Sequence, residues 1–415
     1  MEGDDEVNVS SRGSRYTFGA KTTKKEYGVE VEETFIFSVD LFGNKDDDWA
    51  DRLNYVVTMF FILACVAYTT FVQYITSTPP IDCWCPAEFT DTHVEYVQYH
   101  CWISNTYYVP SSEALSQDDV IRRRFVIKYY QWGPIILFLM ALMFKLPNIL
   151  WRLTNVYSGV NVGNIGRKAA DSQEMTWKKR QETIENLASY LHRWLHLYHN
   201  HDKNWRRFFS KIRNLNCDNR SGNYLTALYM IIKCIYCINV IGQFFLLDVI
   251  LGQNFYLTLG IDFFQRPPSE INQLGLLQFP RVTMCDFKIR QMSNVQDWTV
   301  QCVLPLNMFY EAIFFFLWYW YAFVAVVTFA SLLLWMWRVF FPINKRVFIE
   351  KMLKIHPKNK GKNHEIDKKK LHEFVSDFLR QDGAFVLRMV QRNTSDVFAT
   401  DLVQKLWEHF VNSKS

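Results

Sequence analysis

Four long apolar runs alternate with polar and charged segments along the chain. They cover residues 55–75, 132–151, 224–247 and 313–337. The first and last runs contain no charged residue, and the other two contain one lysine each, Lys145 and Lys233. A helix needs about 20 mainly apolar residues to cross the hydrocarbon core of a bilayer. The pattern therefore predicts four transmembrane helices, because a backbone exposed to lipid must satisfy its own hydrogen bonds.

Basic residues are distributed unevenly between the segments that separate these runs. Segments 152–223 and 338–415 contain 13 and 16 Lys and Arg residues, whereas 76–128 and 252–305 contain four each. Loops rich in basic residues stay in the cytoplasm. We therefore expect both termini and the middle loop inside, although the basic cluster 122–128 locally opposes this orientation. The first fifty residues lack the apolar region of a signal peptide, so the first span is expected to act as its own signal.

The predicted fold is an all-α membrane protein with four transmembrane helices, a cytoplasmic helical dome and two small disulfide-stapled extracellular loops that contain short strands. The expected segments are a cytoplasmic amino-terminal segment with a pore-funnel helix (1–54), the spans 55–75, 129–151, 224–251 and 306–338, the extracellular loops 76–128 and 252–305, a helical cytoplasmic loop (152–223) and a helical cytoplasmic tail (339–415).

Cysteine placement separates the outer loops from the rest of the chain. Five of the nine cysteines fall in the two expected outer loops: Cys83, Cys85, Cys101, Cys285 and Cys302. Disulfides persist outside the cell, where thiols are not kept reduced. The odd number leaves one thiol over, and Cys83 and Cys85 are too close to bridge each other comfortably. Segments 281–287 and 299–305 show the partial alternation of short strands.

Composition and motifs exclude several classes of function. The net charge of +5 on 415 residues is too small to indicate a nucleic-acid partner, and 49% hydrophobic residues exclude disorder as the main state. The chain shows no nucleophile constellation, so we expect no enzyme, cofactor or metal. Four histidines cluster in the middle loop, but Arg193 replaces the glutamate of a zinc motif, which favours an ordinary helix over a metal site; they are His192, His196, His199 and His201.

Residues 129–134, at the start of the second apolar run, read YYQWGP. This sequence resembles the YYQW-x-P that begins the second span of the innexins, the invertebrate gap-junction proteins. The outer-loop sequences 80–84, 99–107, 279–287 and 301–307 and the tail sequence 378–389 resemble innexin sequences in order and spacing. The chain departs from the family pattern at Gly133, which replaces a larger apolar residue, at the additional Cys85, and in a longer amino-terminal segment.

The resemblance implies a ring of subunits in the plasma membrane at cell–cell junctions, with eight subunits in known family members. The ring is a homo-oligomer or is shared with other innexins, contacts membrane lipid, and docks onto the ring of a neighbouring cell. The resemblance also implies two bridges between the outer loops, Cys83 with Cys302 and Cys101 with Cys285.

Several residues are candidates for lining or gating a pore. Pro134 lacks an amide donor and is a candidate hinge or a static kink of the second span. The spacing of Glu88, Asp91 and Glu95 places them on one face of a short helix, as an acidic collar or a solvated surface. The aromatic side chains Phe35 and Phe37 are candidates for a funnel.

The remaining expectations concern the ends and the interior of the spans. Asp46–Asp48 is expected to cap the helix that leads into the first span, and residues 1–30 to lie over the cytoplasmic entrance and reduce conductance. The span lysines either extend to the nearby interface or face a pore. Polar residues in the first and third spans face water or neighbouring helices; they are Thr58, Thr69, Thr70, Gln73, Thr226, Asn239 and Gln243.

Three functions remain to be compared. The first is a gap-junction channel subunit, and the second is an undocked large-pore hemichannel like the pannexins. The third is a four-span adhesion protein without a pore, like the tetraspanins, whose Cys-Cys-Gly motif is absent from this sequence.

Overall fold

The computed structural model describes residues 47–75, 79–109, 122, 126–155, 158–200, 222–251, 279–357 and 367–414, together with four two-residue strands nearer the amino terminus. These strands pair antiparallel, β1 (Tyr16–Thr17) with β4 (Ser38–Val39) and β2 (Lys25–Glu26) with β3 (Val29–Glu30). The side chains of Phe35 and Phe37, predicted to line a funnel, lie outside the described residues.

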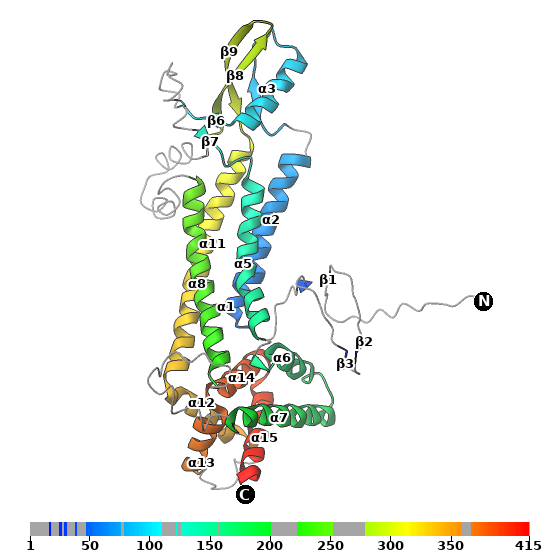
Figure 1. Cartoon of the computed structure of the whole chain (residues 1–415), viewed down its shortest axis with the longest axis vertical. Coiled ribbons are helices and arrows are strands. Elements are labelled where there is room, and N and C mark those ends of the chain that lie inside the picture. The colour runs from blue at the N-terminus through cyan, green and yellow to red at the C-terminus, as the bar shows by residue number, and fades with distance from the viewer. Residues whose placement is uncertain are drawn as a thin grey trace, which may run out of the picture. The chain divides into compact units, whose positions relative to one another are not determined.

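Four long helices carry the apolar runs (Figure 1). The first is continuous over Trp49–Ile75 and consists of α1 (Trp49–Arg52), the π-helical η1 (Leu53–Thr58), α2 (Met59–Thr70) and the π-helical η2 (Phe71–Ile75). The others are α5 (Gly133–Asn155), α8 (Tyr224–Leu251) and α11 (Leu306–Phe340). Among the described residues, the prediction of four helices long and apolar enough to cross a membrane is confirmed. The first helix begins before residue 55, and α5 is shifted toward the carboxyl terminus relative to 129–151.

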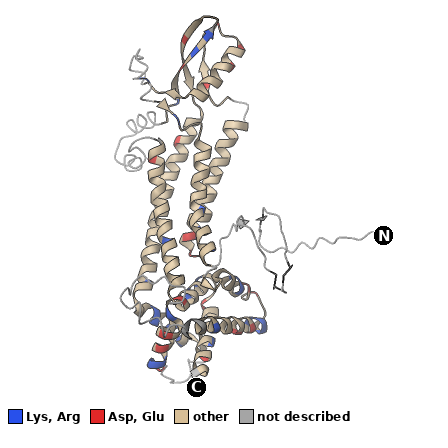
Figure 2. Cartoon of the chain, in the orientation of Figure 1, with Lys and Arg blue, Asp and Glu red and all other residues tan. Residues whose placement is uncertain are grey.

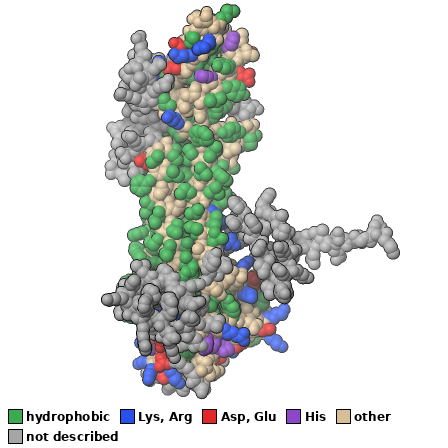
Figure 3. Space-filling model, in the orientation of Figure 1, with side chains coloured by type: hydrophobic (Ala, Val, Ile, Leu, Met, Phe, Trp, Pro, Cys, Tyr) green, Lys and Arg blue, Asp and Glu red, His purple; other side chains and the backbone are tan. Residues whose placement is uncertain are grey.

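The surface of these helices is apolar. Hydrophobic side chains cover them in Figure 3, and few charged residues interrupt them in Figure 2. Only 22% of the most apolar window of Trp49–Ile75 is buried within the chain. An apolar surface of this extent needs a lipid or protein neighbour, because water does not solvate it favourably.

The chain divides into two compact units, and each long helix contributes residues to both. Unit 1 consists of residues 1–56, 147–233 and 332–415, and unit 2 consists of 57–146 and 234–331.

In unit 2 the other long helices pack against α11 through aromatic side chains. Trp320 meets Phe61 of α2 edge-on with ring centroids 4.7 Å apart. The ring centroid of Tyr321 lies 5.4 Å from that of Phe144 in α5 and 6.1 Å from that of Phe244 in α8. Tilted and edge-to-face aromatic pairs of this kind stabilise packing beyond the area that they bury. The aromatic residues of α11 therefore form the centre of the helical part of unit 2.

Gly133, one of the departures from the family pattern, has a steric explanation. It begins α5 directly against the ring of Tyr310 in α11, and a Cβ atom at this position would collide with the phenol ring. Tyr310 is fully buried, so its ring has no open space into which to move. The small residue at 133 and the large residue at 310 are therefore complementary in volume.

Unit 2 also contains a five-stranded antiparallel sheet built from both predicted outer loops. Its order is β5 (Asp82–Trp84), β9 (Asn294–Val303), β8 (Val282–Gln291), β6 (Thr106–Tyr107), β7 (Val126–Ile127). The helix α3 (Asp91–Ser104) packs against β8 and β5. The two strands predicted at 281–287 and 299–305 exist, but they extend farther toward the turn and form a hairpin of two ten-residue strands. Its turn residue Met292 is fully exposed.

Apart from the short strands β1–β4, the described part of unit 1 is helical. Besides the ends of the long helices it contains α6 (Val162–Asp171), α7 (Trp177–Asn200), α12 (Pro342–Ile355), α13 (Lys368–Glu373), the π-helical η6 (Phe374–Leu379), α14 (Arg380–Asn393) and α15 (Asp396–Lys414). The helix α15 packs along α7, and the rings of Phe374, Phe378 and Phe410 contact one another at centroid distances of 5.2–5.7 Å. The predicted packing of the tail against the middle loop is confirmed for residues 177–200; residues 201–215 lie outside the described residues.

Candidate functional site

Three buried aspartates lie at the start of the first long helix. Asp48 is the N-cap of α1, and its Oδ1 accepts a hydrogen bond from the N–H of Trp49 at 2.8 Å. Asp51 accepts a hydrogen bond from the N–H of Asp48 at 3.3 Å, which completes a capping box. Asp47 immediately precedes the cap, and each of the three residues is at most 4% exposed. The predicted capping of this helix is confirmed at Asp48, and carboxylates buried so deeply need charged partners.

Two cations from distant parts of the sequence supply that charge. The Nζ of Lys233, in α8, lies 2.8 Å from Asp51 Oδ1 and 3.5 Å from Asp48 Oδ2. The Nη1 of Arg392, in α14, lies 2.5 Å from Asp48 Oδ1. We call Asp47, Asp48 and Asp51 with Lys233 and Arg392 the aspartate cluster. Its ion pairs tie the first helix to α8 and to the carboxyl-terminal tail.

Neutral donors from all four long helices complete the hydrogen bonding of these carboxylates. Within unit 1, each of the four donates to an aspartate Oδ2 at a distance between 2.6 and 3.3 Å; the donors are Tyr55, Asn148, Tyr229 and Trp335. Low-dielectric surroundings strengthen such bonds and make an unsatisfied group costly. The cluster therefore fixes the four helices and the tail at one place.

Nearby positive charges and hydrogen bonds keep Asp48 ionised despite its burial. Burial by itself raises the pKa of Asp48, but the positive charges of Lys233 and Arg392 and hydrogen bonds from Arg392 and Trp335 hold it well below its usual range. Asp48 is therefore a carboxylate at any physiological pH and does not exchange protons in this range. The arrangement is suited to holding helices together rather than to relaying protons.

The structure corrects the expectation for Lys233. Its side chain does not extend to an interface and does not face open space, because it is buried and forms ion pairs with two aspartates. Lys145, the other span lysine, is half-buried. The sequence contained a signal for these ion pairs, because acidic residues precede the first span and single lysines interrupt two others. Only the tertiary structure shows that Lys233 is the lysine that pairs with Asp48 and Asp51.

A second contact between the tail and α8 involves Asp382 of α14. Its carboxylate accepts hydrogen bonds from the N–H groups of Leu225 and Thr226 at 3.2 and 2.9 Å, and from the Thr226 hydroxyl at 2.8 Å. It thus caps the start of α8 from another part of the chain. The preceding Gly222 has a φ of 72°, a conformation that side chains disfavour, and its carbonyl accepts from the N–H of Asp382 at 3.0 Å. Sequence reasoning missed this cap, because nothing in the local sequence places position 382 beside position 225.

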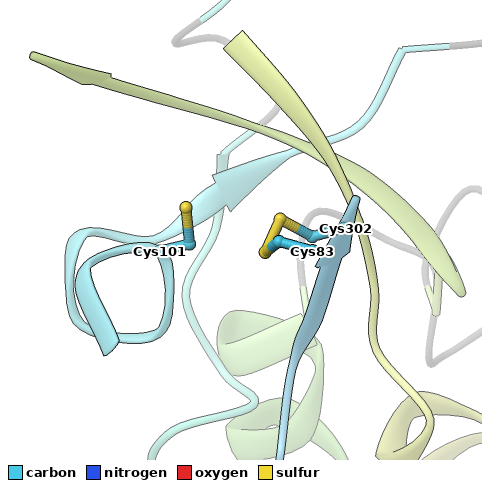
Figure 4. A group of neighbouring side chains, drawn as sticks. All are labelled: Cys83, Cys101 and Cys302. Carbon is cyan, nitrogen blue, oxygen red and sulfur yellow. A yellow bond between two sulfur atoms is a disulfide. The ribbon is translucent and has the colours of Figure 1, made fainter. Parts of the chain in front are cut away.

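The five-stranded sheet carries two disulfides, Cys83–Cys302 and Cys101–Cys285, the pairing that the family resemblance implies. Cys83 lies directly opposite Cys302 in the β5–β9 register. Figure 4 shows this bridge beside Cys101, and the three Sγ atoms lie within 4.8 Å of one another. All three sulfurs are in disulfides, so the group offers no thiolate for a metal. Both bridges join the first outer loop to the second.

Pro134 does not lie in the interior of a helix, where a proline would cause a kink. It is the second residue of α5, in the first turn, where its missing N–H has no intrahelical partner to lose. Pro147 is the proline inside this helix. The physical ground for a kink near the outer end of the span is therefore absent, and a gating role for Pro134 stays a prediction.

The three acidic candidates of the first outer loop are exposed but do not share one helix. Glu88 lies in the turn before α3, whereas Asp91 and Glu95 lie one helical turn apart on it. Thr90 separates them as the N-cap, in a capping box with His93. The prediction that all three lie on one helical face is therefore wrong for Glu88.

Polar residues of the spans find partners within the chain. In unit 2 the Thr58 hydroxyl accepts a hydrogen bond from Trp320 Nε1 at 3.0 Å, and the Thr69 hydroxyl donates to the Cys65 carbonyl at 2.9 Å. In unit 1 Thr226 is bonded to Asp382. Thr58 and Thr226 therefore contact neighbouring helices, one of the two expected alternatives, whereas Thr69 bonds to the backbone of its own helix.

The histidine group of the middle loop meets the tail. His192 and His196 stack on α7 with ring centroids 6.3 Å apart, and His192 lies 5.7 Å from His409 of α15. Nε2 of His409 lies within hydrogen-bonding distance of Glu185 Oε1, at 2.9 Å. The side chains of His199 and His201 lie outside the described residues.

Comparison with known proteins gives one consistent result. The Innexin family model matches residues 47–410. Innexin unc-9 of Caenorhabditis elegans is 36% identical over 373 residues, which cover 89% of this chain and 93% of that protein. Innexin-19 of Caenorhabditis briggsae is 32% identical over 403 residues, covering 92% and 89%. Innexin-11 of Caenorhabditis elegans is 32% identical over 388 residues, covering 91% and 82%.

The contacts of the aspartate cluster predict that Lys233→Met strongly destabilises the folded protein. This change leaves two buried carboxylates short of a counter-charge, which costs about 3–5 kcal/mol in comparable sites. We expect a clearly lower melting temperature of the detergent-solubilised protein. The matched control is Lys288→Met, which breaks an exposed ion pair to Asp297 worth about 1 kcal/mol or less. Lys233→Met combined with Asp51→Asn should recover part of the loss, and equal melting temperatures for the two single variants would contradict the assignment.

Cys85 is predicted to be an accessible but slowly reacting thiol. It is not in a disulfide and is partly exposed; burial and the charge of Asp82 raise its pKa. An impermeant maleimide should label unreduced protein on intact cells, and the labelling rate should rise with pH because only the thiolate reacts. Cys85→Ser should abolish the labelling, whereas Cys83→Ser should add a labelled thiol at Cys302. Labelling that persists in Cys85→Ser would show that another outer cysteine is unpaired.

Proposed function

The chain belongs to the innexin family of gap-junction channel proteins, and from this premise we propose that it forms rings that dock with rings of the adjacent cell. The docked pair passes ions and small solutes between the two cytoplasms. The family consists of channel proteins rather than enzymes. The observation that carries the proposal is that the family match over 47–410 includes all four apolar helices, the disulfide-linked sheet and the tail.

The need for a ring has physical support. Between 22% and 44% of the most apolar windows of the four helices is buried within one chain. The remaining apolar surface is large enough to be shared between lipid and neighbouring subunits. One bundle of four helices cannot enclose a wide aqueous pore, and identical chains assemble most readily with closed symmetry. We propose a ring of eight subunits, as the family resemblance implies. The ring consists of this chain alone or of this chain together with other innexins.

The orientation of the chain also belongs to the proposal. The excess of Lys and Arg in the segments that include α7 and α12 to α15 favours a cytoplasmic location for both termini. The disulfides favour an outer location for the sheet, because bridges persist in an oxidising environment. The sheet with its projecting hairpin is then the surface that meets the opposite ring.

Paired cells test the function directly. Two cells that both express the chain should exchange a small fluorescent dye and show junctional current, while a pair with one expressing cell should not. Dye uptake into single expressing cells, without transfer between pairs, would instead favour the undocked hemichannel. Absence of both, with the protein at the cell surface, would favour the adhesion protein.

The exposed acids of the first outer loop are proposed to favour cations near the pore. The triple variant Glu88→Gln, Asp91→Asn, Glu95→Gln should lower the ratio of cation to anion permeability, because it removes three negative charges from each subunit. Stability should change little, since all three residues are exposed. Asp297→Asn, an exposed acid on β9, is the control that removes charge elsewhere in the sheet. An unchanged permeability ratio in the triple variant would remove the acidic collar from the proposal.

A further inference from the structure

Unit 1 contains a cavity of about 320 Å³ between the end of α11, the start of α12 and α14. Three arginines line it, Arg338, Arg388 and Arg392, together with the aromatic residues Trp337 and Phe348. The volume falls in the range typical of small-molecule sites, about 300–1,000 Å³. The aspartate cluster accounts for Arg392, but neither this cluster nor the proposed channel function explains the guanidinium groups of Arg338 and Arg388.

Ion pairs account for only one of these arginines, Arg392. Lys233 and Arg392 pair with the carboxylates of Asp48 and Asp51, whereas Arg52 donates to the backbone carbonyl of Asp47 at 3.2 Å. Among the described residues, no carboxylate lies within ion-pair distance of Arg338 or Arg388. The nearby Lys345 adds further positive charge, which Asp377 partly offsets. The cavity is therefore strongly positive.

The contacts of Arg388 support an anion site. Its guanidinium donates to the carbonyl oxygens of Arg338 at 3.3 Å and Asn344 at 3.0 Å, and lies 5.1 Å from the ring centroid of Phe348. These contacts orient the group without neutralising it. Burial and repulsion from Arg338 and Arg392 lower the pKa of Arg388 to about 10, so it is still charged at neutral pH. Bidentate binding of phosphate is the interaction for which such a group is best suited.

The surroundings of the cavity indicate that the anion is part of a lipid. Large apolar side chains are exposed at the end of α11 and along α12: Trp337, Phe340, Phe341, Ile343 and Val347. The same helix exposes Arg346, Lys351 and Lys354. Apolar and basic residues on one short helix at the end of a span are typical of contact with an anionic membrane surface. The N-cap residue Phe341 provides no side-chain cap, so the positive end of α12 adds to the attraction.

We propose that this cavity binds the phosphorylated headgroup of an anionic lipid of the phosphoinositide class. The inference goes beyond the proposed channel function and shares with it only the insertion of α11 into a membrane. Arg392 lines the cavity and also pairs with Asp48 at the start of the first helix. A bound phosphate therefore competes with Asp48 for this arginine, which connects lipid binding to the aspartate cluster.

The test measures binding of dioctanoyl phosphatidylinositol bisphosphate to the purified full-length protein in detergent, with dioctanoyl phosphatidylcholine as the neutral lipid. Arg338→Gln and Arg388→Gln should each weaken binding of the phosphoinositide by about tenfold or more, because each removes a charge-assisted contact. Arg338 forms no hydrogen bond or ion pair through its side chain among the described residues, so its replacement should leave the melting temperature nearly unchanged. Arg346→Gln, which removes an exposed charge outside the cavity, should retain affinity within about twofold.

Three results would overturn the proposal. The first is equal binding of the phosphoinositide and phosphatidylcholine, and the second is an equal loss of affinity in Arg338→Gln and Arg346→Gln. The third is binding of soluble inositol trisphosphate or inorganic phosphate as tightly as the lipid, with the same dependence on Arg338, which would assign the cavity to a soluble phosphate. None of these measurements depends on conductance, so a failure here is distinguishable from a failure of the channel proposal.

Discussion

Three aspartates buried at the start of the first long helix set the arrangement of unit 1. A buried carboxylate is tolerated only where cations and hydrogen-bond donors replace water around it. Here the cations come from α8 and α14, and neutral donors come from every long helix. Loss of one charged partner costs about 3–5 kcal/mol, a large part of the 5–15 kcal/mol that typically separates folded from unfolded chains. The cluster therefore favours one arrangement of these segments over its alternatives.

The cluster also explains why the carboxyl-terminal tail belongs with the helices that cross the membrane. Arg392 reaches the start of the first helix, and Asp382, ten positions earlier in the sequence, caps the start of α8. Both contacts come from α14, which is otherwise buried among apolar neighbours. A displacement of α14 would expose an ionised Asp48 and uncap α8 at the same time.

The five-stranded sheet is held together by a different kind of bond. Its two longest strands form one hairpin, and β5 and β6 of the first loop pair with it over three residues or fewer. Ladders this short contribute little stability, so the disulfides are needed to connect the loops. The cysteines could be sorted by redox environment from sequence, and the pairing followed from the family resemblance. The full length of the hairpin could not be predicted from sequence, because the alternation of apolar and polar residues in its strands is interrupted. The start of α3 could not be predicted either, because Glu88 precedes the N-cap Thr90.

The sequence by itself determined the features that depend on local composition. Uninterrupted apolar runs require helices in lipid, and acidic residues before the first span cap its helix. Only the tertiary structure decided which charges meet. Lys233 within an apolar run has the same local pattern whether it extends to an interface, faces a pore or pairs with a buried aspartate. The choice depends on Asp48 and Asp51, more than 180 positions away, and on Arg392, which neutralises Asp48 from the tail. Ion pairs between distant residues leave no periodicity in the sequence, because they depend on where helices end in space.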